Sequence, residues 1–190
     1  RGATFSEWTG EEFDFDGAGF TVNPTMCEIY DAINQQDGYL LCENEGASNT
    51  YDPKEPSLDE IAAVNANFKD SFADYSDAAI VVISRPTSES TDFLPGGVAE
   101  GTGMTEPLAI SPDEWDAIAL AKEASDNVIV LLNTSSAVEI KELKDDEDID
   151  AILWIGNPGC YGLLGVADIL SGKTNPSGGL FDIFPTYNMS

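Results

Sequence analysis

Three short runs of apolar, largely β-branched residues constrain the fold of this chain more than any other feature of its sequence. They span residues 78–84, 127–133 and 150–155. Each run is apolar almost without interruption, which is typical of a strand in a parallel sheet that is covered on both faces. We therefore predict that the three runs are buried strands of one mainly parallel sheet.

Helices are predicted between and around these strands. Ser57 and Ser111 each stand three residues before a glutamate, which is the capping-box pattern of a helix start. Pro24 and Pro112 suit the first position of a helix. The predicted helices therefore run from Asn23 to about residue 38, from Ser57 onward with Ile61, Val64, Phe68 and Phe72 on one face, from Ser111 to about Ser125, and from about Tyr161 to Leu170, ended by Gly172.

The alternation of strands and helices predicts an α/β fold. We expect a three-layer α/β/α sandwich with a mainly parallel sheet and right-handed crossovers, in a flavodoxin-like arrangement. The 190 residues suit a single domain spanning 1–190, with an irregular or incomplete start over residues 1–23. Residues 39–41 and 180–184 are candidates for further short strands.

Charge and composition exclude several functions. The chain has 35 Asp and Glu against 8 Lys and Arg, a net charge of −27, and no histidine. This surface repels phosphate, so we expect no nucleic-acid or membrane partner. The lack of histidine excludes His-based triads and His–metal sites. The acidic run at residues 145–150 lacks the glycine and spacing of a calcium loop, so we expect neither a metal nor a cofactor.

The cysteines and the first residues bear on the origin of the chain. Three cysteines are too few and too scattered for a disulfide framework or a zinc site. No apolar run approaches the ~20 residues that a membrane span needs. The chain begins at Arg1 with no basic-then-apolar leader. We therefore expect a mature or excised piece of a longer protein, and the sequence leaves a cytoplasmic or a secreted bacterial origin open.

The long connection after the first predicted strand carries the candidate chemistry. Residues 85–110 are rich in Gly, Pro, Ser and Thr and include Arg85, Glu89 and Asp92. Ligands of parallel sheets meet the loops that leave the carboxyl ends of the strands. A carboxylic acid there can protonate a leaving oxygen and later deprotonate a water, which is the work of glycoside hydrolysis without histidine. The alternative reading of Glu89 is a solvated surface acid.

A glycine-rich turn offers a different hypothesis. Residues 156–162 follow a predicted strand and open a helix, which is where a phosphate-binding loop stands. The spacing is not G-x-G-x-x-G, and the lysine of a P-loop is absent. An independent flavodoxin-like nucleotide binder is therefore the weaker reading.

Several strings, taken together, resemble one known family. Residues 79–92, AIVVISRPTSESTD, are similar to the strand and acid/base loop of the α/β-sandwich domain of glycoside hydrolase family 3, the β-glucosidase-like enzymes. The resemblance extends to residues 19–25, 110–115 and 127–140. Residues 165–185 resemble the closing part of that domain, with its Asn-Pro-Ser-Gly string. The match covers most of residues 19–187.

The resemblance implies a retaining glycosidase that acts on terminal β-glycosidic bonds of a carbohydrate substrate. By position, Glu89 matches the acid/base glutamate of the family. Asp92 matches the acid of an Asp-Arg pair, and Arg85 matches the arginine after the strand, so we expect both to bind or position substrate. The family's nucleophilic Asp lies on a (β/α)₈ barrel domain, which takes about 250 residues. We therefore expect this chain to need that barrel as its partner and to hydrolyse nothing alone.

The sequence departs from the family pattern around the acid/base position. Ser88 and Ser90 stand where the family has glycines, and Phe93 stands where it has an arginine. Gly179 replaces a basic residue of the closing motif. These substitutions favour a second hypothesis, in which the chain is a non-catalytic carbohydrate-binding or interaction module derived from that domain.

Overall fold

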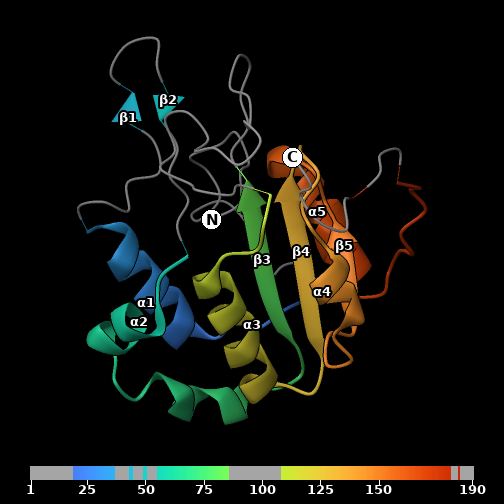
Figure 1. The fold of residues 1–190 in the computed structure, drawn as a ribbon. Helices are drawn as coiled ribbons and strands as arrows, with labels where there is room; N and C mark the ends of the chain where they lie inside the picture. The colour runs from blue at the N-terminus through green and yellow to red at the C-terminus, as the bar shows by residue number, and fades with distance from the viewer. Residues whose placement is uncertain are drawn as a thin grey trace.

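A computed structural model describes residues 19–36, 43–44, 49–50, 55–85, 108–180 and 184. At its centre lies a sheet of three strands in the order β3-β4-β5, all parallel (Figure 1). The strands are β3 (Ala79–Arg85), β4 (Val128–Thr134) and β5 (Ala151–Trp154). The three predicted strands and their parallel pairing are confirmed.

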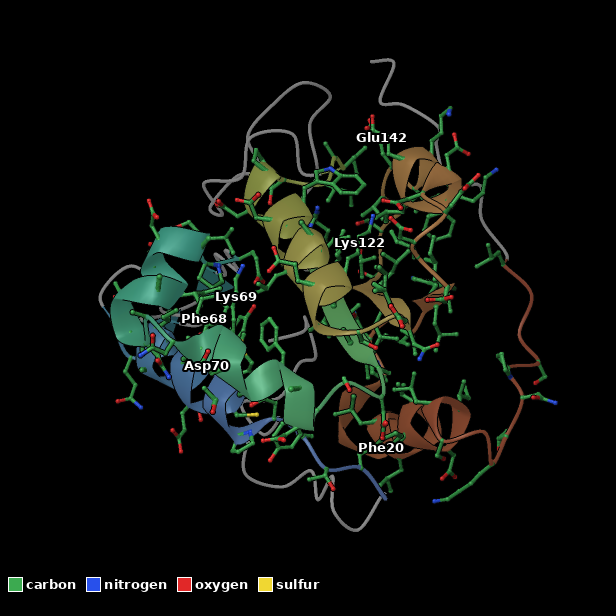
Figure 2. The ribbon with its side chains drawn as sticks, turned by 90° about the horizontal axis from the view of Figure 1, so that it is seen from below. Phe20, Phe68, Lys69, Asp70, Lys122 and Glu142 are labelled. Carbon is green, nitrogen blue, oxygen red and sulfur yellow. The ribbon has the colours of Figure 1, made fainter. Side chains whose placement is uncertain are left out.

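Helices lie on both faces of this sheet. In Figure 2, which looks along the strands, α3 (Pro112–Ala124) and α4 (Lys141–Asp145) lie on one side and α5 (Gly159–Leu170) lies on the other. This arrangement confirms the predicted α/β fold. The core between the sheet and the α3 side consists of Ile83, Ile118, Val130, Leu132, Val138 and Leu143.

A second apolar cluster lies beside the sheet. It joins α1 (Pro24–Asn34), α2 (Leu58–Val64) and a 3₁₀ helix, η1 (Phe68–Asp74). Two short strands, β1 (Glu43–Asn44) and β2 (Asn49–Thr50), pair antiparallel in the chain between α1 and α2. The cluster reaches the sheet layer through α3, because Leu120 belongs to it together with Ile29, Ile33, Ile61 and Phe68.

Three predicted helix starts, at Asn23, Ser57 and Ser111, are confirmed by their caps. The Asn23 side chain accepts hydrogen bonds from the backbone N–H groups of Thr25 and Met26. Ser57 and Ser111 both form complete capping boxes, in which the side chain of the glutamate three residues later accepts a hydrogen bond from the serine backbone N–H. Helix α4 was not predicted; its five residues are anchored by Leu143, which is buried.

The predicted helix after Ser57 is wrong in one respect. Helix α2 ends at Val64, and the chain continues through an extended Asn65 into η1. Val64 is exposed rather than on the apolar face. The Asn65 side chain accepts a hydrogen bond from the Asn67 backbone N–H, and such local bonds compete with the helix.

The burial predicted for the first strand is also wrong in part. Ile80 and Val82 are 44% and 39% exposed, whereas Ile83 is fully buried. Consecutive residues of β3 are buried only at its end, from Ile83 to Arg85. The parallel pairing therefore holds, but one face of the first half of β3 is open among the described residues.

Some sequence predictions fall on residues that the structure does not describe. These are most of the start at 1–23, the short strand at 39–41, and residues 181–183 of the last strand. Within the described ranges, none of the helices combines the length and apolar character that crossing a bilayer requires.

Candidate functional site

The candidate site lies at the carboxyl ends of β3 and β4, at one edge of the sheet (Figure 1). Arg85 is the last residue of β3 and pairs in register with Thr134, and Ser84 pairs with Asn133. The structure thus places Arg85 at the predicted edge. Glu89 and Asp92 lie outside the described residues, so their predicted roles stay predictions.

An ion pair between β3 and α3 holds the Arg85 side chain in place. Its Nη1 and Nη2 atoms donate to Oε1 and Oε2 of Glu114 at 2.6 and 2.9 Å. The same two nitrogens also donate to the carbonyl oxygens of Ser84 and Ala109, at 2.7 and 2.6 Å. The arginine is 0% exposed and the glutamate 8%. A bidentate arginine–carboxylate pair fixes the relative orientation of the two side chains and also compensates their charges.

The Glu114 carboxylate also takes part in the cap at the start of helix α3. Oε2 of Glu114 accepts a hydrogen bond from the Ser111 backbone N–H at 2.7 Å, and the Glu114 N–H donates to Ser111 Oγ at 3.2 Å. The capping box was predicted from the sequence, but the pairing of its glutamate with Arg85 was not. The available signal was an arginine at the end of a buried strand, where its charge needs a partner. Glu114 thus couples the start of α3 to the end of β3.

On the opposite face of the strand ends lies a different polar pair. Ser84 and Asn133 are adjacent in the ladder, and side chains of such partners point to the same face. Nδ2 of Asn133 donates to the Gly156 carbonyl at 2.5 Å. Ser84 Oγ and Asn133 Oδ1 are buried and have no hydrogen-bond partner among the described residues.

The turn after β5 leads into α5 through two glycines in left-handed backbone conformation. Gly156 and Gly159 have φ angles of 60° and 62°, which favour glycine. Helix α5 begins at Gly159, two residues earlier than predicted, and Pro158 provides no side-chain cap. Trp154 Nε1 donates to the Thr134 carbonyl at 2.7 Å and so ties this turn to the end of β4.

The site therefore offers a rigid frame rather than a complete set of reacting groups. The described part of the chain contains no cluster of three or more His, Cys, Asp or Glu that could hold a metal. Its charged groups at the edge, Arg85 and Glu114, are engaged with each other. The ion pair thus fixes the backbone at residue 85, where β3 ends.

Comparison with known proteins identifies the family of the chain. The sequence profile of the glycosyl hydrolase family 3 C-terminal domain matches residues 9–188. Beta-glucosidase A of Butyrivibrio fibrisolvens is 32% identical over 145 residues, which cover 69% of this chain and 17% of that protein. A beta-glucosidase of Schizophyllum commune is 32% identical over 106 residues, or 55% of this chain and 53% of that protein.

A plant relative is named as a xylosidase rather than a glucosidase. Beta-D-xylosidase 3 of Arabidopsis thaliana is 36% identical over 61 residues, which cover 32% of this chain and 8% of that protein. The chain thus spans between about a twelfth and about half of the length of these relatives. The match over residues 9–188 takes in every described element and most of the sequence. The chain belongs to glycosyl hydrolase family 3 and comprises a C-terminal domain of that family.

Proposed function

We propose that this chain is the α/β-sandwich domain of a retaining β-glucosidase-type enzyme and supplies its acid/base residue, Glu89. The observation that carries the proposal is the clamp of Arg85 by Glu114, which fixes the end of β3 four residues before Glu89. The relatives named as beta-glucosidases and a beta-xylosidase support terminal β-linked glucosides or xylosides as the substrate class.

In this proposal the reaction has two steps. The Glu89 carboxyl protonates the glycosidic oxygen while an aspartate of a barrel domain attacks C1, so that the leaving group departs and a glycosyl-enzyme forms. The Glu89 carboxylate then takes a proton from a water that attacks C1, which releases the sugar and restores both carboxyl groups. Asp92 positions the substrate, and the buried Arg85, held by Glu114, anchors the start of the connection that carries Glu89.

The test is a substitution in the full-length enzyme that contains this domain. Glu89→Gln is expected to lower kcat on an alkyl β-glucoside by ~10²–10⁴-fold, because a poor leaving group needs the proton. Glu100→Gln, in the same connection, is the matched control and is expected to leave the rate unchanged. An unchanged rate for Glu89→Gln would remove Glu89 from the mechanism.

A second experiment separates the domain from its partner. The purified 190-residue chain is expected to show no turnover of an aryl β-glucoside, because the nucleophile lies on the barrel. Turnover by the chain alone would contradict the division of catalytic groups between two domains.

The serines at 88 and 90 and the phenylalanine at 93 favour a second candidate function, a non-catalytic carbohydrate-binding module. That candidate predicts that the chain alone binds a β-glucoside with a measurable heat of binding. It also predicts that Glu89→Gln leaves the activity of the parent protein unchanged.

A further inference from the structure

Strand β3 has a free edge among the described residues. The sheet order is β3-β4-β5, so β3 pairs with β4 on one side. The Ala79 N–H donates to the Asn127 carbonyl at 2.9 Å and therefore points toward β4. Backbone N–H groups of successive strand residues point to opposite sides of the strand, so those of Ile80, Val82 and Ser84 point away from β4. These three N–H groups form a row along the free edge.

The face of β3 that is turned toward α5 is apolar and open. Ile83 packs in the core on the α3 side, so Ile80 and Val82 lie on the other side of the sheet, which is the side of α5 (Figure 2). These two residues are 44% and 39% exposed. Leu131, which pairs in register with Val82, is only 5% exposed. The face is therefore covered over β4 and uncovered over the edge strand.

The chemistry of this surface indicates what completes it. A parallel sheet is covered on both faces, and an exposed edge strand is a template for pairing with another strand. A further strand beside β3 accepts the outward row of N–H groups, and a helix that follows this strand covers the apolar face. A strand–helix unit therefore satisfies both the edge and the face.

Two observations favour the parent polypeptide over a second copy as the source of this unit. The net charge of −27 makes two copies repel each other. The matched regions form 17% and 53% of the two beta-glucosidase relatives, so proteins of this kind carry further sequence. A strand in the same polypeptide is also held near the edge at a high effective concentration.

We propose that the free edge and the open face of β3 bind a strand–helix unit from another part of the parent protein, whose strand pairs parallel with β3 and whose helix covers Ile80 and Val82. The strand is apolar on both faces and lacks proline, because it becomes a buried member of a parallel sheet. This inference rests on the family of the chain and is independent of the catalytic role of Glu89.

The test measures amide hydrogen exchange in the 190-residue chain and in the full-length enzyme that contains it. In the chain, protection is expected to alternate along β3, high at Val81 and Ile83 and low at Ile80 and Val82. In the full-length enzyme, the amides of Ile80 and Val82 are expected to exchange on the order of 100-fold more slowly than in the chain, because they become ladder donors. Mass spectrometry of the β3 peptide with fragmentation to single residues gives the rates. Rapid exchange at Ile80 and Val82 in the full-length enzyme would by itself overturn the proposal.

A charge placed on the open face gives an independent test. Val82→Lys is expected to lower the urea midpoint of the full-length enzyme on the order of 0.5 M, because the covered site buries the charge. Val64→Lys adds the same charge at a valine of α2 that is 37% exposed, and it is expected to leave the midpoint unchanged. Equal midpoints for the two variants would contradict the proposal.

The second copy is the competing occupant, and sedimentation of the chain distinguishes it. The chain alone is expected to be a monomer. A dimer that protects the amides of Ile80 and Val82, and that Val82→Lys returns to a monomer, would assign the surface to a second copy and overturn the proposal.

Discussion

Arg85 at the end of β3 and Glu114 in the first turn of α3 hold each other in a buried ion pair, with N–O distances of 2.6 and 2.9 Å. The two residues are 29 positions apart in the sequence. This bidentate pair joins the carboxyl end of β3 to α3, and it gives the first prediction.

Glu114→Gln is expected to lower the free energy of unfolding by about 3–5 kcal/mol, because it leaves a buried guanidinium without a counter-charge. The double variant Arg85→Met with Glu114→Leu is expected to lose less than Glu114→Gln alone, because no charge remains buried. Urea unfolding followed by circular dichroism measures both, with Asp116→Asn on the exposed side of α3 as the control. A loss below about 1 kcal/mol for Glu114→Gln would mean that the pair is solvated.

The hydroxyl of Ser84, which has no hydrogen-bond partner among the described residues, gives a second prediction, with a matched buried serine as its control. Ser84→Ala is expected to leave stability unchanged or raise it by about 1 kcal/mol, because a buried polar atom without a partner is removed. Ser125 donates to the Ser76 carbonyl and accepts from the Asn127 N–H. Ser125→Ala is therefore expected to cost about 1–2 kcal/mol. Equal losses for the two variants in thermal unfolding would show that Ser84 has a partner.

Two isoleucines of β3 provide a third prediction. Ile83 is fully buried between the sheet and α3, so Ile83→Ala is expected to cost about 2–5 kcal/mol. Ile80 is 44% exposed, and Ile80→Ala is expected to cost less than about 1 kcal/mol. The urea midpoints of the two variants are compared, and a much larger loss for Ile83→Ala than for Ile80→Ala would show that the face of β3 that carries Ile80 is open in solution. A large loss for Ile80→Ala would show that this face is covered.

The acidic limb of the stability profile gives a fourth prediction. Lys122, which Figure 2 labels on α3, donates to both carboxylate oxygens of Asp146, and this hydrogen bonding lowers the pKa of Asp146. A folded pKa below the unfolded value of 3.8 means that the contribution is present above pH 3.8 and lost as the pH falls through the lower folded value.

Asp146→Asn is therefore expected to reduce stability at pH 6 by less than about 1 kcal/mol, since the pair is partly solvated. At pH 2 the variant and the wild type are expected to unfold at the same urea concentration. A difference that grows toward low pH would have the wrong sign for this ion pair. Burial raises the pKa of Glu55 to about 7, so the dependence of that group is opposite: its contribution to stability is lost as the pH rises from about 4.5 to about 7.

Much of the frame was predictable because its signals are local. The strands β3, β4 and β5 follow from continuous apolar runs, and the starts of α2 and α3 follow from the Ser-x-x-Glu pattern at residues 57 and 111. The family that the sequence strings resemble is confirmed by the family match over residues 9–188.

What the sequence did not reveal depends on partners that are distant in the chain. The capping pattern predicts Glu114 as a cap, but its pairing with Arg85 depends on how α3 crosses β3. Apolar residues at Ile80 and Val82 indicate burial, but their exposure depends on which layer lies over them. Val64 continues a helical pattern, but the Asn65 side chain ends the helix at that point.

The hydrogen bond from Arg85 to the Ala109 carbonyl has a consequence for how this domain tolerates change. It brings the residue that leaves the strand next to the residues that lead into α3, so the intervening segment departs from and returns to a single anchored point. Doubling the length of such a segment raises its closure entropy by only about 0.6 kcal/mol. We therefore expect insertions and deletions between these two anchored ends to leave the sheet and its helices intact.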